Sequence, residues 1–165
     1  IVDTDMLAAN AVSSAKLASG AGGKILQVVS ASTTSTVSNT TDTFADTGLT
    51  ATISISANSK VLILTSQQLD ISRNSDNAAR GSVKLLRGST DIFAPRNSKS
   101  FGIEAGSANL NLFMLLTTSF LDTGASTGSN TYKTQFRING ASNSHTIRIN
   151  DDGGKSAITL LEVAG

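Results

Sequence analysis

The sequence contains no cysteine and no tryptophan, and it has few aromatic residues of any kind. Without cysteine there is no disulfide framework and no thiol chemistry. Aromatic residues make up only 4% of the chain, so a deep pocket lined with aromatic side chains would be hard to build. These absences exclude thiol enzymes and argue against a conventional small-molecule pocket.

Charge is scarce as well. Charged residues make up 15% of the chain, against about 25% in ordinary soluble domains, and the formal net charge is +1. A protein that binds DNA, RNA or an anionic membrane needs a basic surface, which this balance does not supply. No signal peptide is recognisable, and no apolar run approaches the roughly 18 residues of a membrane span. We therefore expect no nucleic-acid partner and no membrane insertion.

The 165 residues are enough for one domain with a core and a short appendage. The chain begins with Ile1 rather than Met, which suggests a part of a longer protein. Residues 1–23 form the expected appendage, since their apolar residues recur every five positions: Val2, Leu7, Val12 and Leu17.

Two interpretations of residues 1–23 stay open. The segment is either an extended fibrous repeat or a short Ala-rich helix, with Thr4 as its N-cap and Gly20 as its stop. Neither form buries its own apolar side, so both need neighbouring chains or the following domain. The glycines that follow, up to Lys24, read as a joint rather than a phosphate-binding loop, because Ile25 replaces the required Ser or Thr.

From residue 24 to residue 165 the pattern is β throughout, and no sustained helical periodicity occurs. Turn-forming residues separate short candidate strands at a spacing typical of a sandwich or jelly roll. The expected strands are Lys24–Ala31, Thr41–Phe44, Leu49–Ser56, Lys60–Asp70, Ala79–Leu86, Thr90–Phe93, Ala108–Phe120, Thr131–Ile138, His145–Asn150 and Ser156–Val163.

The strands differ in how their apolar residues are distributed. Leu49–Ser56 and Thr131–Ile138 alternate between apolar and polar residues, as half-buried strands do. Three other segments are apolar on both faces: Val61–Leu64, Leu112–Leu116 and Ile158–Val163.

In a two-layer sandwich only one face of each sheet meets the core, so a second apolar face needs another cover. Large exposed apolar patches are rare on monomers, which favours association of identical subunits. The alternative is that bulges or corner strands bury both faces internally. The predicted subunit interface comprises Leu7, Val12, Leu17, Leu62, Leu64, Phe113, Leu115 and Leu161.

Catalytic and metal-binding signals are weak. His145 is the only histidine, and a Ser-His-Asp site would need it beside Asp151 or Asp152. No G-x-S-x-G elbow accompanies it, so we expect a solvated residue at a strand end. Asp151–Gly154 reads as a hairpin turn rather than a Ca²⁺ loop, because no EF-hand spacing surrounds it. We expect a protein that is not an enzyme and that has no metal or cofactor.

Two stretches of the sequence resemble sequences of a known protein family. The stretch DMLAANAVSSAKLASGAGGKILQVV resembles the stalk-to-tip junction of phage tail-fibre proteins, which carry repeats of the type L-A-x-x-A-V-x-x-A-K-L-A-x-G-A. The later pattern TFADTGLTATIS…SKVLILT, followed by YKTQFRING…HTIRIN…SAITLLEVAG, is similar to the C-terminal domains of fibre-like proteins from marine phages. Together these stretches span essentially the whole chain.

The resemblance implies a homotrimeric jelly-roll head on a slender stalk, with both chain ends near the stalk. It further implies display on the exterior of a virion, attachment to other virion proteins through the N-terminal stalk, and contact with a glycan or outer-membrane receptor on a bacterium. The expected function is adsorption to the host. The alternatives are a purely structural head or neck fibre or capsid decoration and, more remotely, a polysaccharide depolymerase, which would need two facing carboxylates.

If both chain ends lie at the stalk, strand directions predict which loops lie at the distal end. These are residues 32–40, 72–78, 122–129 and 151–154. The residues in them best suited to bind sugar hydroxyls are Arg73, Asn74, Asp76, Asn77, Asp122 and Thr123. The long connection Pro95–Ser107 is the next candidate.

Overall fold

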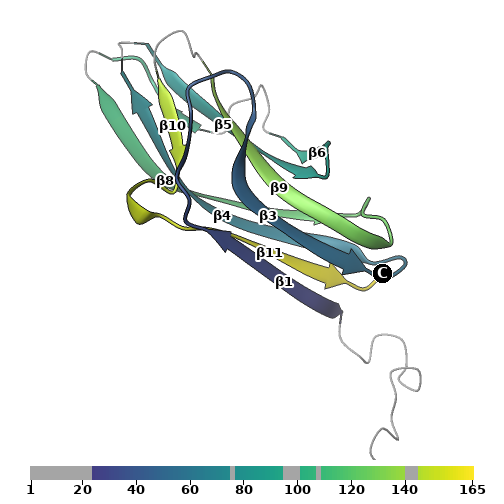
Figure 1. The fold of residues 1–165 in the computed structure, drawn as a ribbon. Helices are drawn as coiled ribbons and strands as arrows, with labels where there is room; N and C mark the ends of the chain where they lie inside the picture. Colours follow the sequence, from purple (N-terminus) through teal and green to yellow (C-terminus); the bar gives the residue numbers. More distant parts are fainter. Residues whose placement is uncertain (1–23, 75–76, 95–100, 107–108, 140–144) are drawn as a thin grey trace, which may run out of the picture.

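The computed structural model describes residues 24–74, 77–94, 101–106, 109–139 and 145–165. Figure 1 shows that they form two layers of β-strands, and the described part of the chain contains no α-helix. The predicted all-β class is therefore confirmed. The strands are β1 (Ile25–Thr33), β2 (Val37–Asn39), β3 (Ala45–Ile55), β4 (Lys60–Arg73), β5 (Ala79–Arg87), β6 (Thr90–Phe93), β7 (Phe101–Ile103), β8 (Leu110–Asp122), β9 (Gly128–Asn139), β10 (Thr146–Ile149) and β11 (Ser156–Val163).

The first sheet, here called sheet A, has two strand positions that are each occupied by two shorter strands placed end to end. β11 pairs with the first half of β4 and β10 with the second half, so β10 and β11 lie end to end. On their other side β1 pairs with β11 and β2 with β10. β8 pairs along the whole of β4 and closes the other edge. All pairings are antiparallel. Sheet A therefore has four strand positions when strands placed end to end are counted together: β1 with β2, β10 with β11, β4 and β8.

The second sheet, sheet B, is antiparallel and has the order β3, β9, β5 and β6. β7 pairs with the start of β5 while β6 pairs with its end, so β6 and β7 share one edge. The pairing in the two sheets is nested along the chain. β1 and β2 pair with β10 and β11, β3 with β9, β4 with β8, and β5 with β6 and β7.

Alternating side chains explain how the sheets pack. In β3 every second residue from Thr47 to Ile55 is buried and those between are exposed; in β9 the buried series includes Tyr132 and Phe136. The alternation predicted for these two strands is confirmed. Side chains from both sheets meet in two apolar clusters, one around Ile63 and Tyr132 and the other around Ile71 and Phe136. The clusters are separated along the strands by buried polar residues: Thr47, Thr65, Gln67, Thr134 and Ser156.

The connection from β10 to β11 corrects one prediction. Asp151–Gly153 forms a short 3₁₀ turn, η5, but the strands on either side of it do not pair with each other. Instead of a hairpin, the turn interrupts one continuous strand position beside β4. Positive φ angles at Asn150 (57°), Asp152 (51°) and Gly153 (78°) let the chain leave the strand and return to it. The turn therefore lies in the middle of sheet A and not at its distal end.

Asn150 holds the two interrupted strand positions together. Its side chain is fully buried and donates from Nδ2 to the carbonyl oxygens of Thr33 (3.1 Å) and Ser35 (3.3 Å), while Oδ1 accepts from Ser156 Oγ (2.7 Å). Its backbone N–H donates to Gln68 O at 3.0 Å. One residue thus contacts β1, β4 and β11 at the point where the ladder is broken.

Three strand assignments also differ from the prediction. Thr41–Phe44 is not a strand, and β2 and β7 were not expected. The reason at the first site is the Asn39 side chain, whose Oδ1 accepts from Thr41 N at 2.8 Å and whose Nδ2 donates to Thr43 O at 2.9 Å. A side chain that satisfies neighbouring backbone groups turns the chain away from a ladder.

We predict that Asn150→Ala lowers the free energy of unfolding by about 3 kcal/mol, because buried partners lose their hydrogen bonds and alanine tolerates a positive φ poorly. Urea unfolding followed by circular dichroism measures the change. The matched control is Asn58→Ala, since Asn58 also has a positive φ (65°) but is exposed. The control should lose only about 1 kcal/mol, and equal losses would show that the side-chain bonds of Asn150 contribute nothing.

Candidate binding surfaces

The outer face of sheet A carries large exposed apolar side chains, together with hydroxyls such as those of Ser30 and Thr159. Val28, Phe113 and Leu115 expose 57%, 60% and 64% of their surface, far more than core residues of the same types. Alternation along the strands turns these side chains away from the core. We call this surface the apolar face and define it by Val28, Leu62, Leu64, Phe113, Leu115, Leu121 and Leu161.

Strand register aligns part of the apolar face into one row. Val28 is paired with Leu161, Leu161 with Leu62, and Leu62 with Leu121, so four apolar side chains cross all four strand positions. Farther along β8, a hollow of about 390 Å³ is lined by Gln68, Phe113, Met114 and Leu115. The face becomes charged directly beside this hollow, since Asp70 is paired with Phe113, and Arg148 Nη1 lies 2.7 Å from Asp70 Oδ2 and 3.1 Å from Ser72 Oγ.

The structure brings five of the predicted interface residues together. Leu62 and Leu64 come from β4, Phe113 and Leu115 from β8, and Leu161 from β11, and all five belong to the apolar face. The other predicted interface residues, Leu7, Val12 and Leu17, lie outside the described residues. The second apolar side of these strands therefore lies on the exterior of the described domain, where its own two sheets do not cover it.

The outer face of sheet B has the opposite chemistry. Hydroxyl side chains line β3, where Thr52 Oγ1 lies 2.8 Å from Thr131 Oγ1 of β9. Three cations on β5 and β9 form ion pairs across this face: Arg80 with Glu104, Lys84 with Asp91, and Lys133 with Asp46. The outer face of sheet B is thus suited to water, whereas the outer face of sheet A contains the exposed residues of the apolar face.

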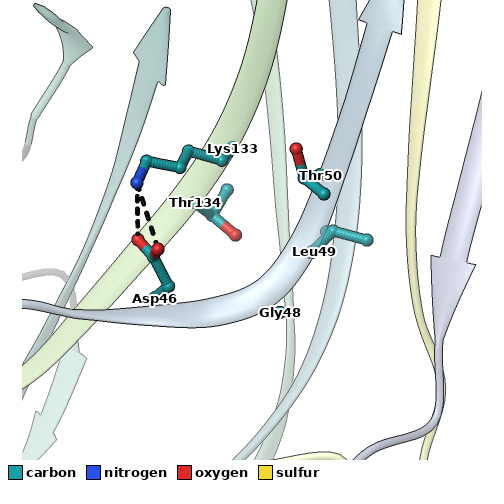
Figure 2. Close-up of a pocket in the computed structure, with 6 residues that line it drawn as sticks. All are labelled: Asp46, Gly48, Leu49, Thr50, Lys133 and Thr134. Atoms are coloured by element: carbon teal, nitrogen blue, oxygen red, sulfur yellow. Dashed lines mark hydrogen bonds and ion pairs between the residues drawn. The ribbon is translucent and has the colours of Figure 1, made fainter. Parts of the chain in front are cut away.

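Sheet B also carries a hollow that the sequence did not predict. About 210 Å³ in size, it lies between β3 and β9 (Figure 2). The one residue in the sequence that could have indicated this hollow is Gly48, because an isolated glycine within a strand indicates a bulge. The hollow is lined by Asp46, Gly48, Leu49, Thr50, Lys133 and Thr134.

Asp122 and Thr123 were predicted as distal loop residues, and the structure corrects both. Asp122 ends β8 and is paired with Val61 at the start of β4. The start of β1 is paired with the end of β11, which in turn is paired with Lys60. Asp122 and Thr123 therefore lie at the same end of the sandwich as the start of β1 and the end of β11.

Asp122 is also inaccessible. It is only 4% exposed, and its Oδ2 accepts from Arg87 Nη1 at 2.6 Å and from the Tyr132 hydroxyl at 2.9 Å. Its Oδ1 accepts from Gly124 N at 2.9 Å. Burial, with the hydrogen bond to Asp122, raises the pKa of Tyr132 above its ordinary value. These contacts make Asp122 a structural link between the sheets and remove it from the candidates for sugar binding.

The opposite, distal end holds three of the other predicted residues. Arg73 is buried and donates to the carbonyl oxygen of Glu104, so it holds a loop in place. Asn74 and Asn77 are exposed there, whereas Asp76 lies outside the described residues. The six predicted binding residues therefore do not form one site.

His145 is buried rather than solvated, which corrects another prediction. It has no exposed surface, and its Nδ1 accepts from Asn74 N at 3.2 Å. Burial lowers the pKa of His145, and the charge of Arg73 lowers it further. A neutral ring that accepts a backbone hydrogen bond positions the distal loop.

The described residues include no group of three or more His, Asp or Glu side chains arranged to hold a metal ion. Nor does the described part contain a helix long and apolar enough to cross a membrane. Comparison with known protein families finds no family model that matches the chain, and comparison with curated proteins finds none that is similar. A function must therefore be argued from the surfaces themselves and from the sequence resemblance.

The depressed pKa of His145 predicts a pH dependence. The unfolded chain binds a proton near pH 6.5 whereas the folded chain binds it at lower pH, so the free energy of unfolding should fall as the pH drops from about 6.5 to about 5. Few carboxylates titrate in this window, which isolates the histidine. Urea unfolding at a series of pH values should show the slope, and His145→Gln should remove it. A slope that persists in the variant would assign it to another group.

Proposed function

We propose that this chain is the distal domain of a bacteriophage fibre, that it assembles as a homotrimer through the apolar face, and that it adsorbs to a bacterial surface. The observation that carries the proposal is the row Val28, Leu161, Leu62 and Leu121, which crosses sheet A on its outer side. A monomer would leave this row in water, and monomers rarely expose large apolar patches. Contact with identical chains is the economical cover.

The strand order supports a jelly roll, the fold that the resemblance implies. A jelly roll has eight strands in two sheets, built from two Greek keys. When two Greek keys form and the chain folds back on itself, the first strand position pairs with the last, the second with the next to last, and so on toward the middle of the chain. The strand positions of this domain pair in the same nested way. We therefore propose that the domain is a jelly roll, with β1 joined to β2, β6 to β7 and β10 to β11 as single strand positions.

The position of the chain ends supports attachment to a stalk. β1 begins and β11 ends at the same end of sheet A. A stalk carrying other virion proteins can therefore continue from this end, and the loops at the other end and the polar face of sheet B point away from it. We place the domain on the exterior of the virion.

Adsorption is favoured over catalysis because most of the described carboxylates lie in ion pairs with basic side chains. Asp46, Asp70, Asp91, Glu104 and Asp122 each form an ion pair with a lysine or arginine. A depolymerase needs two facing carboxylates, one of them protonated. A purely structural decoration remains the second candidate, because the apolar face explains assembly equally well without a receptor.

Leu115→Asp tests the assembly. Leu115 is 64% exposed on the single chain, so the variant should fold and should be a monomer where the wild-type protein has three times the 16.9 kDa chain mass. Light scattering at micromolar and nanomolar concentrations measures this. Thr52→Asp, a change at an exposed residue of the polar face, is the control and should remain a trimer. A wild-type monomer, or a trimer of Leu115→Asp, would contradict the assignment of the interface.

The same variant tests adsorption. Binding of the labelled protein to a panel of bacterial strains should be detectable for the wild type and weaker by about 10²-fold or more for monomeric Leu115→Asp, because three linked weak sites gain by avidity. Equal binding by monomer and trimer would contradict multivalent adsorption. A trimer that binds none of the strains would favour the decoration.

A further inference from the structure

The hollow on sheet B owes its shape to a bulge in β3. Asp46 is paired with Gln135 and Thr50 with Lys133, so three residues of β3 lie opposite Thr134 alone. The extra residues push the edge strand outward. Gly48 stands at the centre with a φ of 80°, and a Cβ there would have no atom within 4 Å. The residue is therefore required for its backbone conformation, and the space beside it is open.

The bulge is fixed from the inside. Thr47 Oγ1 lies 2.6 Å from Thr134 Oγ1 and accepts from Leu49 N at 3.1 Å, and all three residues are buried. Leu49 packs in the apolar cluster around Ile63. Because the residues on both sides of Gly48 are anchored in the core, the hollow exists before any ligand arrives, which reduces the cost of binding.

The rim of the hollow carries an acceptor next to a donor. Lys133 Nζ lies 3.0 Å from the carboxylate oxygens of Asp46, and Gln135 Nε2 donates to the same carboxylate at 2.8 Å (Figure 2 shows the Asp46–Lys133 pair). The hydrogen bond from Gln135 lowers the pKa of Asp46 and Lys133 adds to this effect, so the carboxylate is charged at neutral pH. A carboxylate offers about four acceptor positions and an ammonium three donors, so both groups can bind further partners.

We propose that this hollow binds one sugar ring of a bacterial surface glycan through two adjacent hydroxyl groups, one donating to Asp46 and the other accepting from Lys133. The inference rests on the proposed adsorption function and names its site. At about 210 Å³ the hollow is smaller than the roughly 300–1,000 Å³ of sites for larger ligands, which suits a single ring. Side-chain exposures of 55% for Asp46 and 30% for Lys133 leave the pair open to solvent.

Position and affinity agree with this role. The hollow is on the outer face of sheet B, whereas the apolar face belongs to sheet A, so association through the apolar face leaves three hollows accessible. An open site with few polar contacts binds one sugar weakly, and three copies on one fibre compensate by avidity.

The test is a titration of the full chain with the methyl α-pyranosides of glucose, galactose and mannose, followed by amide NMR. These sugars present adjacent hydroxyls in both the equatorial–equatorial and the axial–equatorial arrangement. We expect at least one of them to cause saturable shifts, at millimolar concentration, centred on Gly48, Thr50 and Thr134. Absence of saturable shifts with all three sugars, or shifts centred elsewhere, would overturn the proposal.

Two variants, each with a matched control, sharpen the test. Asp46→Asn removes the charge of the acceptor and should weaken binding about tenfold. Asp91→Asn breaks a similar carboxylate–lysine pair on the same face and should leave binding unchanged. Gly48→Asn keeps a residue type that tolerates positive φ but fills the open space, so it should abolish binding. Gly88→Asn, at another positive-φ glycine with open space, is its control. Unchanged binding by both Asp46→Asn and Gly48→Asn would also overturn the proposal.

Failure of this inference can be told apart from failure of the proposed function. If the trimer adsorbs to cells and Gly48→Asn adsorbs equally well, the receptor binds elsewhere and only the hollow is wrongly assigned. If the sugars bind at the hollow but the trimer adsorbs to no strain, the site is correct and the adsorption function is wrong.

Discussion

The buried side chain of Asn150 is the contact on which the continuity of sheet A depends. Two of the four strand positions in this sheet are broken at the same level, and without a link there the halves could shift relative to β4. Asn150 bonds to β1, to the segment that precedes β2, and to β11, while its backbone bonds to β4. Since a shift of one residue would turn every side chain to the other face, the row of apolar side chains on the exterior depends on this register.

The two outer faces of the sandwich differ in chemistry, and the proposed assembly uses one of them while the other meets solvent. Sheet A turns leucines and Val28 outward beside hydroxyls and the Arg148–Asp70 ion pair, whereas sheet B turns mainly hydroxyls and ion pairs outward. The same pleat produces both, because alternate residues of each strand leave the core on opposite sides. The proposed association through sheet A and the proposed contact with a hydrated surface through sheet B would both use this difference.

Much of the secondary structure could be predicted from the sequence, and the errors have local causes. Leu49–Ser56 and Thr131–Ile138 alternate clearly and were assigned correctly to strands with the correct inward faces. Thr41–Phe44 was wrong because the Asn39 side chain captures the backbone there. Asp151–Gly154 has turn chemistry, which the structure uses to interrupt a strand instead of joining a hairpin. Five interface candidates share one face, but Val28 and Leu121 were missed because their place depends on register.

By itself the sequence determined most of the strands and, through alternation, which of their side chains face the core and which face outward. Tertiary structure decided what those side chains stand beside. Val28 and Leu161 are neighbours only because β1 pairs with β11. The hollow at Gly48 exists only because β3 has two more residues than β9 at the bulge. Backbone hydrogen bonds join any two strands irrespective of residue type, so strand order and register arise from packing of the whole chain and not from local pattern.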